Sequence, residues 1–126
     1  VSVNELYQIF NVGVSKYWET HYNLDKESSK KFKKLSKSFV NLLIINTIIP
    51  LRFSFALSQK KEITQELIDL ATLIPAEQNA VIEKFGIFGL QINNVYESQA
   101  LLELKKNYCD YKKCLDCAIG HFILKK

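Results

Sequence analysis

The chain has 126 residues, of which 48% are hydrophobic and 24% charged, and its formal net charge is +4. This balance is ordinary for a globular domain and excludes intrinsic disorder, a collagen-like repeat and a disulfide-dense scaffold. Four Gly and two Pro are too few for an all-β fold with many tight turns, so the composition favours helix. Because Met is absent and Val1 comes first, we interpret the chain as a segment cut from a larger protein.

Two short helices are predicted first. Ser2 and Glu5 have capping-box spacing, and apolar residues recur at helical intervals over residues 3–10. Ser15 can cap a second helix, which carries Trp18. Residues 23–29 are polar and show no periodic apolar face, so we expect a loop there.

The positive charge is concentrated in one stretch. Residues 23–38 hold six Lys and two acidic residues, so this stretch alone accounts for the net charge. Such a run is usually a solvated loop or helix end, and the alternative is a patch that binds nucleic-acid phosphates. Sequence-specific DNA reading is disfavoured, because Arg52 is the only Arg available for bidentate base contacts. The candidate nucleic-acid contacts are Lys30, Lys31, Lys33 and Lys34.

The apolar run that begins at Phe39 predicts a buried helix at the centre of the fold. Pro50 removes one backbone donor and its ring crowds the carbonyl of Asn46, so a kink or break is expected near Asn46. Asn41, Asn46 and Pro50 interrupt the run and Arg52 follows it, which argues against a membrane span. We therefore expect a cytoplasmic domain with no membrane partner.

The second half of the chain predicts further helices. An amphipathic stripe covers residues 62–74, a helix runs from Pro75 to Phe85, and residues 87–94 form a loop. Another helix begins at Glu97 or Ser98, and the last covers residues 111–124. Residues 1–126 are thus expected to form one all-α domain, a compact bundle of five to seven helices around the central buried, Pro-kinked helix.

Three cysteines and a histidine are clustered near the C-terminus: Cys109, Cys114, Cys117 and His121. Four such ligands fit a tetrahedral zinc site, and three thiolates could instead hold part of an iron–sulfur cluster. All four can bind one metal only if the helix begins after Cys114, because seven helical residues span about 10.5 Å. Cys114, Cys117 and His121 also have the spacing of a buried helical stripe, and Cys114 with Cys117 could form a redox pair. We favour the buried stripe and expect no cofactor, with zinc or an iron–sulfur cluster as the alternative.

No complete catalytic constellation is visible. His21 lies among aromatic residues, where a hydrogen-bonded packing role is the commoner one. Glu77 and Glu97 are explained as solvated acids at helix starts. The chain has no Gly-rich phosphate loop, no Gly-x-Ser-x-Gly and no His-Glu-x-x-His. An enzyme is therefore the least favoured class.

Five stretches carry a resemblance to a family: Trp18 with His21-Tyr22, residues 45–50, 75–79 and 98–101, and the cysteine tail over 108–120. Together they resemble the C-terminal part of a bacterial family catalogued as domain of unknown function 2851, most specifically in the last twenty residues. The resemblance implies a longer protein whose N-terminal part carries a nuclease-like acidic motif. That N-terminal part is then the expected partner of this chain.

Two functions remain open. The first is a non-catalytic helical scaffold or interaction domain of a larger bacterial protein. The alternative is a helical module, bearing zinc or an iron–sulfur cluster, that assists nucleic-acid binding by the nuclease-like N-terminal part. We favour the first, because no catalytic group is apparent and the basic stretch is local.

Overall fold

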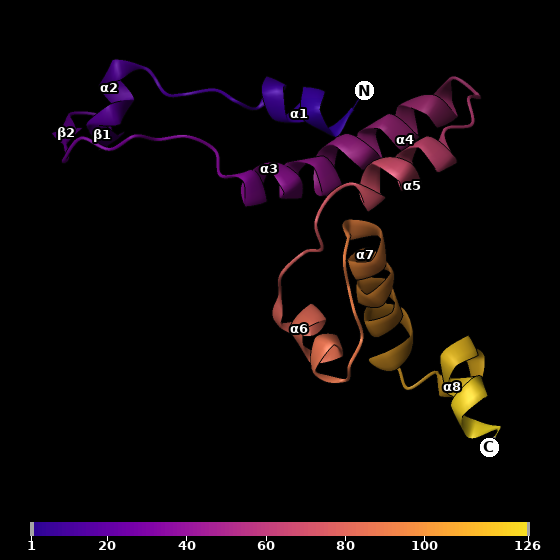
Figure 1. Cartoon of the computed structure of the whole chain (residues 1–126). Coiled ribbons are helices and arrows are strands. Elements are labelled where there is room, and N and C mark those ends of the chain that lie inside the picture. Colours follow the sequence, from indigo (N-terminus) through magenta and orange to yellow (C-terminus); the bar gives the residue numbers. More distant parts are fainter. Residues whose placement is uncertain (1, 126) are drawn as a thin grey trace. The chain divides into compact units, whose positions relative to one another are not determined.

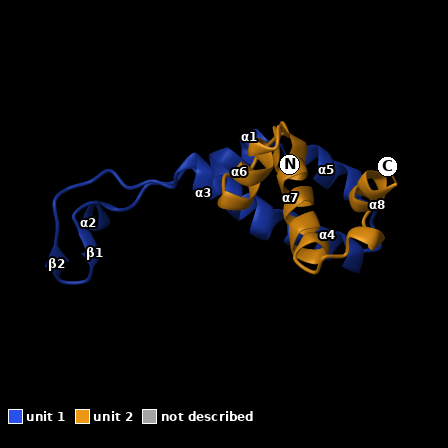
Figure 2. Ribbon diagram, turned by 90° about the horizontal axis from the view of Figure 1, so that it is seen from below, with its two compact units in different colours: residues 1–70 blue, residues 71–126 orange. Residues whose placement is uncertain are grey.

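The computed structural model describes residues 2–125, and it confirms the all-α fold. Counted as continuous helices, the described residues form seven, with one small two-stranded sheet (Figure 1). The chain groups into two compact units, residues 1–70 and residues 71–126, which Figure 2 colours separately. The boundary falls inside helix α5 (Thr64–Thr72), and each unit is described in turn.

The first unit opens with the predicted capped helix, α1 (Val3–Ile9). The Ser2 hydroxyl accepts from the Glu5 N–H, and the Glu5 carboxylate accepts from the Ser2 N–H at 2.7 Å. After α2 (Lys16–Glu19), strands β1 (His21–Asn23) and β2 (Lys26–Glu27) pair antiparallel where the sequence predicts a loop. Strands this short leave no readable period in the sequence. Asp25 takes the left-handed turn position between them, φ +59°, which Asp tolerates.

A continuous helix follows, built from α3 (Lys37–Leu43), the π-helical turn η1 (Ile44–Ile48) and α4 (Ile49–Ser58). Pro50 distorts this helix without breaking it, because the π turn lies directly ahead of the proline. In that turn the Ile49 N–H donates to the Ile44 carbonyl, five residues back, so the carbonyls facing the proline ring are displaced from α-helical positions. The Asn46 side-chain amide donates to the Leu42 carbonyl at 3.1 Å. This bond adds a donor in the part of the helix where the regular backbone hydrogen bonds are disturbed.

Fewer residues of this helix are buried than its apolar sequence predicts. Val40, Ile44, Ile45 and Ala56 are buried, whereas Asn46, expected inside, is exposed. Side chains of α1 and α5 contact this helix. Tyr7 of α1 donates its hydroxyl to the Asn41 amide oxygen at 2.7 Å, and Arg52 pairs with Glu66 of α5. Large apolar side chains therefore stay exposed: Phe39, Leu42, Leu51, Phe53, Phe55 and Leu57.

By length and composition alone, the helix Lys37–Ser58 could cross a membrane. It has 22 residues and a mean hydropathy of 1.7 in its most apolar window, 22% of which is buried, and it is the one such helix within residues 2–125. The expectation of no membrane span rested on polar interruptions, which the structure places inside one unbroken helix. Core helices of soluble proteins meet the same criteria, so the helix needs a direct test.

The second unit contains α6 (Ala80–Ile87), α7 (Val95–Leu104), the π turn η2 (Lys105–Cys109), the 3₁₀ turn η3 (Cys114–Asp116) and α8 (Ala118–Leu124). Helix α6 begins five residues later than predicted, because Asn79 caps it by accepting from two backbone N–H groups. The segment from Pro75 is extended instead, and Pro75 forms a bridge pair with Asn94. Helix α7 begins earlier than predicted, since Asn94 caps it by accepting from the Glu97 N–H.

Candidate functional site

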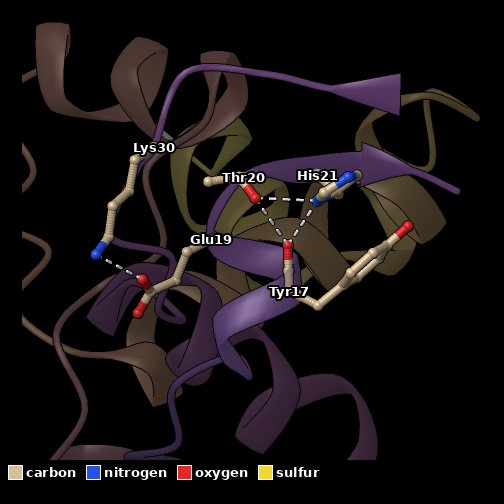
Figure 3. Close-up of polar contacts among 5 residues, drawn as sticks. All are labelled: Tyr17, Glu19, Thr20, His21 and Lys30. Atoms are coloured by element: carbon tan, nitrogen blue, oxygen red, sulfur yellow. Dashed lines mark hydrogen bonds and ion pairs between the residues drawn. The ribbon is translucent and has the colours of Figure 1, made fainter. Parts of the chain in front are cut away.

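The first candidate surface is the region of α2, β1 and β2, which we call the aromatic hairpin (residues 16–27). The rings of Tyr17 and His21 stack with centroids 3.9 Å apart, and Trp18 meets Tyr17 edge-on at 5.1 Å. His21 Nδ1 lies 2.9 Å from the Tyr17 carbonyl oxygen and 3.0 Å from the Thr20 hydroxyl, the contacts drawn in Figure 3. The Tyr17 carbonyl accepts a hydrogen bond from His21 in the tautomer that carries its proton on Nδ1. His21 thus has the packing environment expected of it.

The four predicted lysines have different environments. Lys30 forms an ion pair with Glu19 at 3.1 Å (Figure 3), and Lys33 donates to the His21 carbonyl at 2.6 Å while lying 3.6 Å above the Tyr22 ring. These two lysines hold the basic stretch against the aromatic hairpin. Lys31 and Lys34 form no side-chain ion pair or hydrogen bond with the described residues.

Lys34 lines an open cavity of about 680 Å³ in the first unit. Lys37 lines the same cavity, and its Nζ lies 4.9 Å from the centre of the Tyr7 ring. The sequence does not reveal this pairing with α1, because the residues are thirty positions apart in the chain. The other polar lining groups are Asn4, Gln8 and Asn11.

The second candidate site is the cysteine tail. The chain reverses after η2 through a Schellman-type turn, in which Lys113 N–H donates to the Tyr108 carbonyl and Lys112 N–H to the Cys109 carbonyl, both at 3.0 Å. Lys112 has φ +54°, the left-handed position that this turn requires. Cys114 then opens the 3₁₀ turn, and Cys117 is the residue before α8.

The interpretation of Cys114, Cys117 and His121 as one buried helical stripe is wrong. The helix begins only at Ala118, so the three residues do not share one helix, and Cys114 and His121 are exposed. Instead Cys109, Cys114 and Cys117 line one apolar cavity of about 190 Å³, and His121 is not among its lining residues.

The metal-ligand set predicted from the sequence is not assembled. Among residues 2–125, no group of three or more His, Cys, Asp or Glu side chains is placed to hold a metal ion. The predicted condition that the helix begin after Cys114 is met, but His121 lies in α8 and Cys109 in η2 without converging on one point with the others. Thiols that share an apolar cavity remain the chemical feature of the tail.

A polar network in the second unit escaped the sequence reasoning. Ser98 is fully buried, donates to the Val95 carbonyl at 3.1 Å and accepts from the Glu77 N–H at 3.2 Å. The Glu77 carboxylate accepts from the Gln99 and Asn79 amides, so it is a connector and not the solvated acid expected. The sequence signal that could have indicated this role of Glu77 is Asn79, a good N-cap residue. A helix that begins after Asn79 leaves Glu77 on an extended segment.

The described fold is that of an all-α protein with a basic aromatic hairpin and a thiol-lined cavity. A family model described as protein of unknown function (DUF2851) matches residues 1–80, more than half of the chain. The chain belongs to this family.

The match covers three of the five stretches that carried the resemblance: the aromatic hairpin, residues 45–50 and residues 75–79. Residues 98–101 and the cysteine tail lie beyond it, so the tail is not the specific part of the family match. No curated protein and no solved structure matches the chain.

Proposed function

We propose that this chain is a non-catalytic interaction domain that binds another polypeptide through the helix Lys37–Ser58. The observation that carries the proposal is the exposure of large apolar side chains along this helix, with Leu51 at 64% and Phe55 at 66%. These two residues are four apart in α4 and share a face. Extended exposed apolar patches mark interaction sites in soluble proteins.

The chemistry of the helix favours a polypeptide partner over lipid. Arg52 carries a charge on the helix and pairs with Glu66, and Asn41 is hydrogen-bonded to Tyr7, so the helix carries charged and polar groups within its length. A protein surface tolerates such groups at the edge of an interface more readily than the bilayer core does. Arg52 is the only charged residue in 38–58, so the partner face should itself be apolar and poor in charge. An N-terminal part of a longer protein is the partner that we infer.

A charge placed on the apolar face tests this proposal. Leu51→Glu with Phe55→Glu removes two contacts worth roughly 1.5–3 kcal/mol each when buried, so self-association or polypeptide binding should weaken by about 100-fold or more. Ser54→Glu with Ser58→Glu adds the same charge on the same helix without removing an apolar group and is the matched control. The readouts are light scattering after gel filtration and binding of an environment-sensitive apolar dye.

Three outcomes are informative. Dye binding and concentration-dependent association of the unmodified chain, lost in the first variant and kept in the control, would support the interaction domain. A monomer that binds no dye would overturn it. Co-flotation of the chain with phosphatidylcholine vesicles would identify a lipid surface as the partner and overturn the polypeptide proposal.

A second function, contact with nucleic acid, is favoured by one specific observation. Lys31 and Lys34 form no ion pair with another residue of the described range 2–125, while Trp18 and Tyr22 of the adjacent aromatic hairpin are exposed. Ammonium groups beside exposed rings are the combination that holds single-stranded nucleic acid through phosphate attraction and base stacking. No zinc or iron–sulfur centre is needed for this mode.

The lysine environments determine the variants for this second function. Lys31→Gln with Lys34→Gln removes the free charges and spares Lys30 and Lys33, which hold the hairpin. Lys60→Gln with Lys61→Gln, beyond the end of α4, removes equal charge elsewhere. Anisotropy of a labelled mixed-sequence single-stranded oligonucleotide should show weakening of about tenfold at low salt in the first variant only. Equal weakening in both variants, or no binding by the unmodified chain, would reject this function.

A further inference from the structure

The cysteine tail brings three thiols to one small cavity without assembling a metal site. Cys109 ends η2, Cys114 begins η3 and Cys117 precedes α8, yet all three line the same apolar hollow of about 190 Å³. Cys109 and Cys114 are exposed and Cys117 is half-buried, so reagents in solution can reach the group. Exposed free thiols at close spacing are reactive rather than structural.

Backbone packing fixes Cys114 against the start of α8. A Cβ placed on Gly120 would lie 2.2 Å from the Cys114 carbonyl oxygen, an approach that only glycine allows. The Schellman-type turn at Lys112 folds η3 back beside η2. Cys114 therefore packs directly against the first turn of α8, where it lines the cavity.

Cys114 and Cys117 have the separation that a disulfide needs. The Cys117 N–H donates to the Cys114 carbonyl at 3.4 Å, which closes a turn of four residues. Such a turn holds its end Cα atoms within about 7 Å. A disulfide requires a Cα separation of about 4.4–6.8 Å. Cys109 is not held to either of them by a turn of this kind.

We propose that Cys114 and Cys117 form a dithiol site that exchanges electrons with a low-molecular-weight disulfide of the glutathione type. Cys114, the more exposed of the two, attacks one sulfur of the small disulfide as a thiolate. A bond forms between the Cys114 sulfur and that sulfur, the original S–S bond breaks, and one thiolate leaves. Lys113 precedes Cys114 in the chain, and its Nζ lies 5.2 Å from the centre of the Tyr111 ring, so its positive charge favours the approach of an anionic disulfide to Cys114.

Cys117 completes the exchange. Its thiolate attacks the Cys114 sulfur of the mixed disulfide, the Cys114–Cys117 bond forms, and the second small thiolate leaves. The two protein thiols lose two protons and two electrons, and the small disulfide becomes two thiols. Cys109 stays reduced.

Intact mass measurement on the full chain tests the site. The reduced protein is equilibrated with glutathione and glutathione disulfide at several ratios, quenched with acid, alkylated and mapped by peptide. We expect a species that has lost two hydrogens, with Cys109 alone alkylated. Cys109→Ser should keep this species, whereas Cys114→Ser and Cys117→Ser should lose it and carry glutathione on the remaining partner.

Far-ultraviolet circular dichroism of each variant checks that the helices are retained. Three outcomes would overturn the proposal: glutathione adducts without an internal disulfide at every ratio, a disulfide that persists in Cys117→Ser, or a disulfide that joins two chains. A disulfide that requires Cys109 would place the reactive pair elsewhere in the cavity and would likewise reject the Cys114–Cys117 pair.

Discussion

Ser98 shows how a single polar residue can organise a helical core. It lies at 0% exposure among apolar neighbours, and both of its hydrogen bonds are to backbone groups. A buried hydroxyl is tolerated when it forms hydrogen bonds. Here it also accepts from the Glu77 N–H, which lies in an extended segment and has no helical backbone partner. Ser98 therefore joins the segment before α6 to the first turn of α7.

Ser98→Ala should lower the free energy of unfolding by about 1–3 kcal/mol, because it leaves the Glu77 N–H without its partner. Urea denaturation followed by circular dichroism measures the change. Ser54→Ala, at an exposed position of α4, should stay within about 0.5 kcal/mol. Equal effects from the two substitutions would mean that the buried hydrogen bonds contribute nothing specific.

The pair between Arg52 and Glu66 predicts an acid sensitivity. The hydrogen bond from Arg52, and then its charge, hold the pKa of Glu66 below its ordinary value of 4.5, and hydrogen bonds from Thr64 lower the pKa of Glu62. A carboxyl whose pKa is depressed by folding contributes stability above its unfolded pKa, and that contribution is lost as the pH falls through the folded pKa.

Stability should therefore decline as the pH falls through 4.5 and below. Glu66→Gln should flatten part of this decline, because Gln does not titrate. Urea midpoints at a series of pH values between neutral and acid make the comparison. An unchanged slope in the Glu66→Gln variant would assign the acid sensitivity to other groups.

Element boundaries were where sequence patterns predicted least. The capping box of Ser2 and Glu5 is local, so α1 was predictable almost to the residue. The start of α6 was not predictable, because both Pro75 and Asn79 are start signals for a helix. In the structure the Asn79 side chain accepts two backbone hydrogen bonds, so the helix begins after Asn79. The π turn before Pro50 could not be predicted from the sequence either, because it depends on how the whole helix adjusts to the missing backbone N–H of Pro50.

The cysteine site illustrates the same limit at a helix end. Its spacing fitted three interpretations, and the choice depended on where α8 begins. Near that start Gly120 lies close to the Cys114 backbone, and such a contact cannot be predicted from the presence of a glycine in the sequence. The clustering was predictable, whereas the shared cavity was not.

Gly120→Ala should displace η3 from α8. The new methyl group would meet the Cys114 backbone oxygen at 2.2 Å, so the turn must shift or the tail must loosen, and Cys114 should alkylate faster. Gly86→Ala in α6 is the control, because nothing lies within 4 Å of the added carbon and Ala favours helix by roughly 1 kcal/mol. Gly120→Ala should raise the alkylation rate of Cys114 and lower the urea midpoint, whereas Gly86→Ala should leave the alkylation rate unchanged and raise the urea midpoint. A Gly120→Ala variant that keeps the original alkylation rate would contradict the packing described.

At the scale of the molecule, composition predicted the fold class well and the organisation less well. Scarce Gly and Pro and helical periodicity sufficed for an all-α protein, because these signals are summed along the chain. The division at residues 70 and 71 has no linker to mark it, since it falls within α5. Whether the two units unfold as the single domain predicted from the sequence is therefore a question of cooperativity, not of pattern.

Trp18 makes that question measurable, because it is the only Trp and lies in the first unit. Ile82→Val shortens a buried side chain in the second unit and should cost about 0.5–1.5 kcal/mol. If the chain is one cooperative domain, this change lowers the urea midpoint seen by Trp18 fluorescence as much as that seen by circular dichroism. Ile44→Val, in the first unit, must lower the fluorescence midpoint in either case and confirms that Trp18 reports unfolding. If Ile82→Val leaves the fluorescence midpoint unchanged, the two units are separate domains. In a single cooperative domain, a local loss of packing lowers the midpoint measured by every probe.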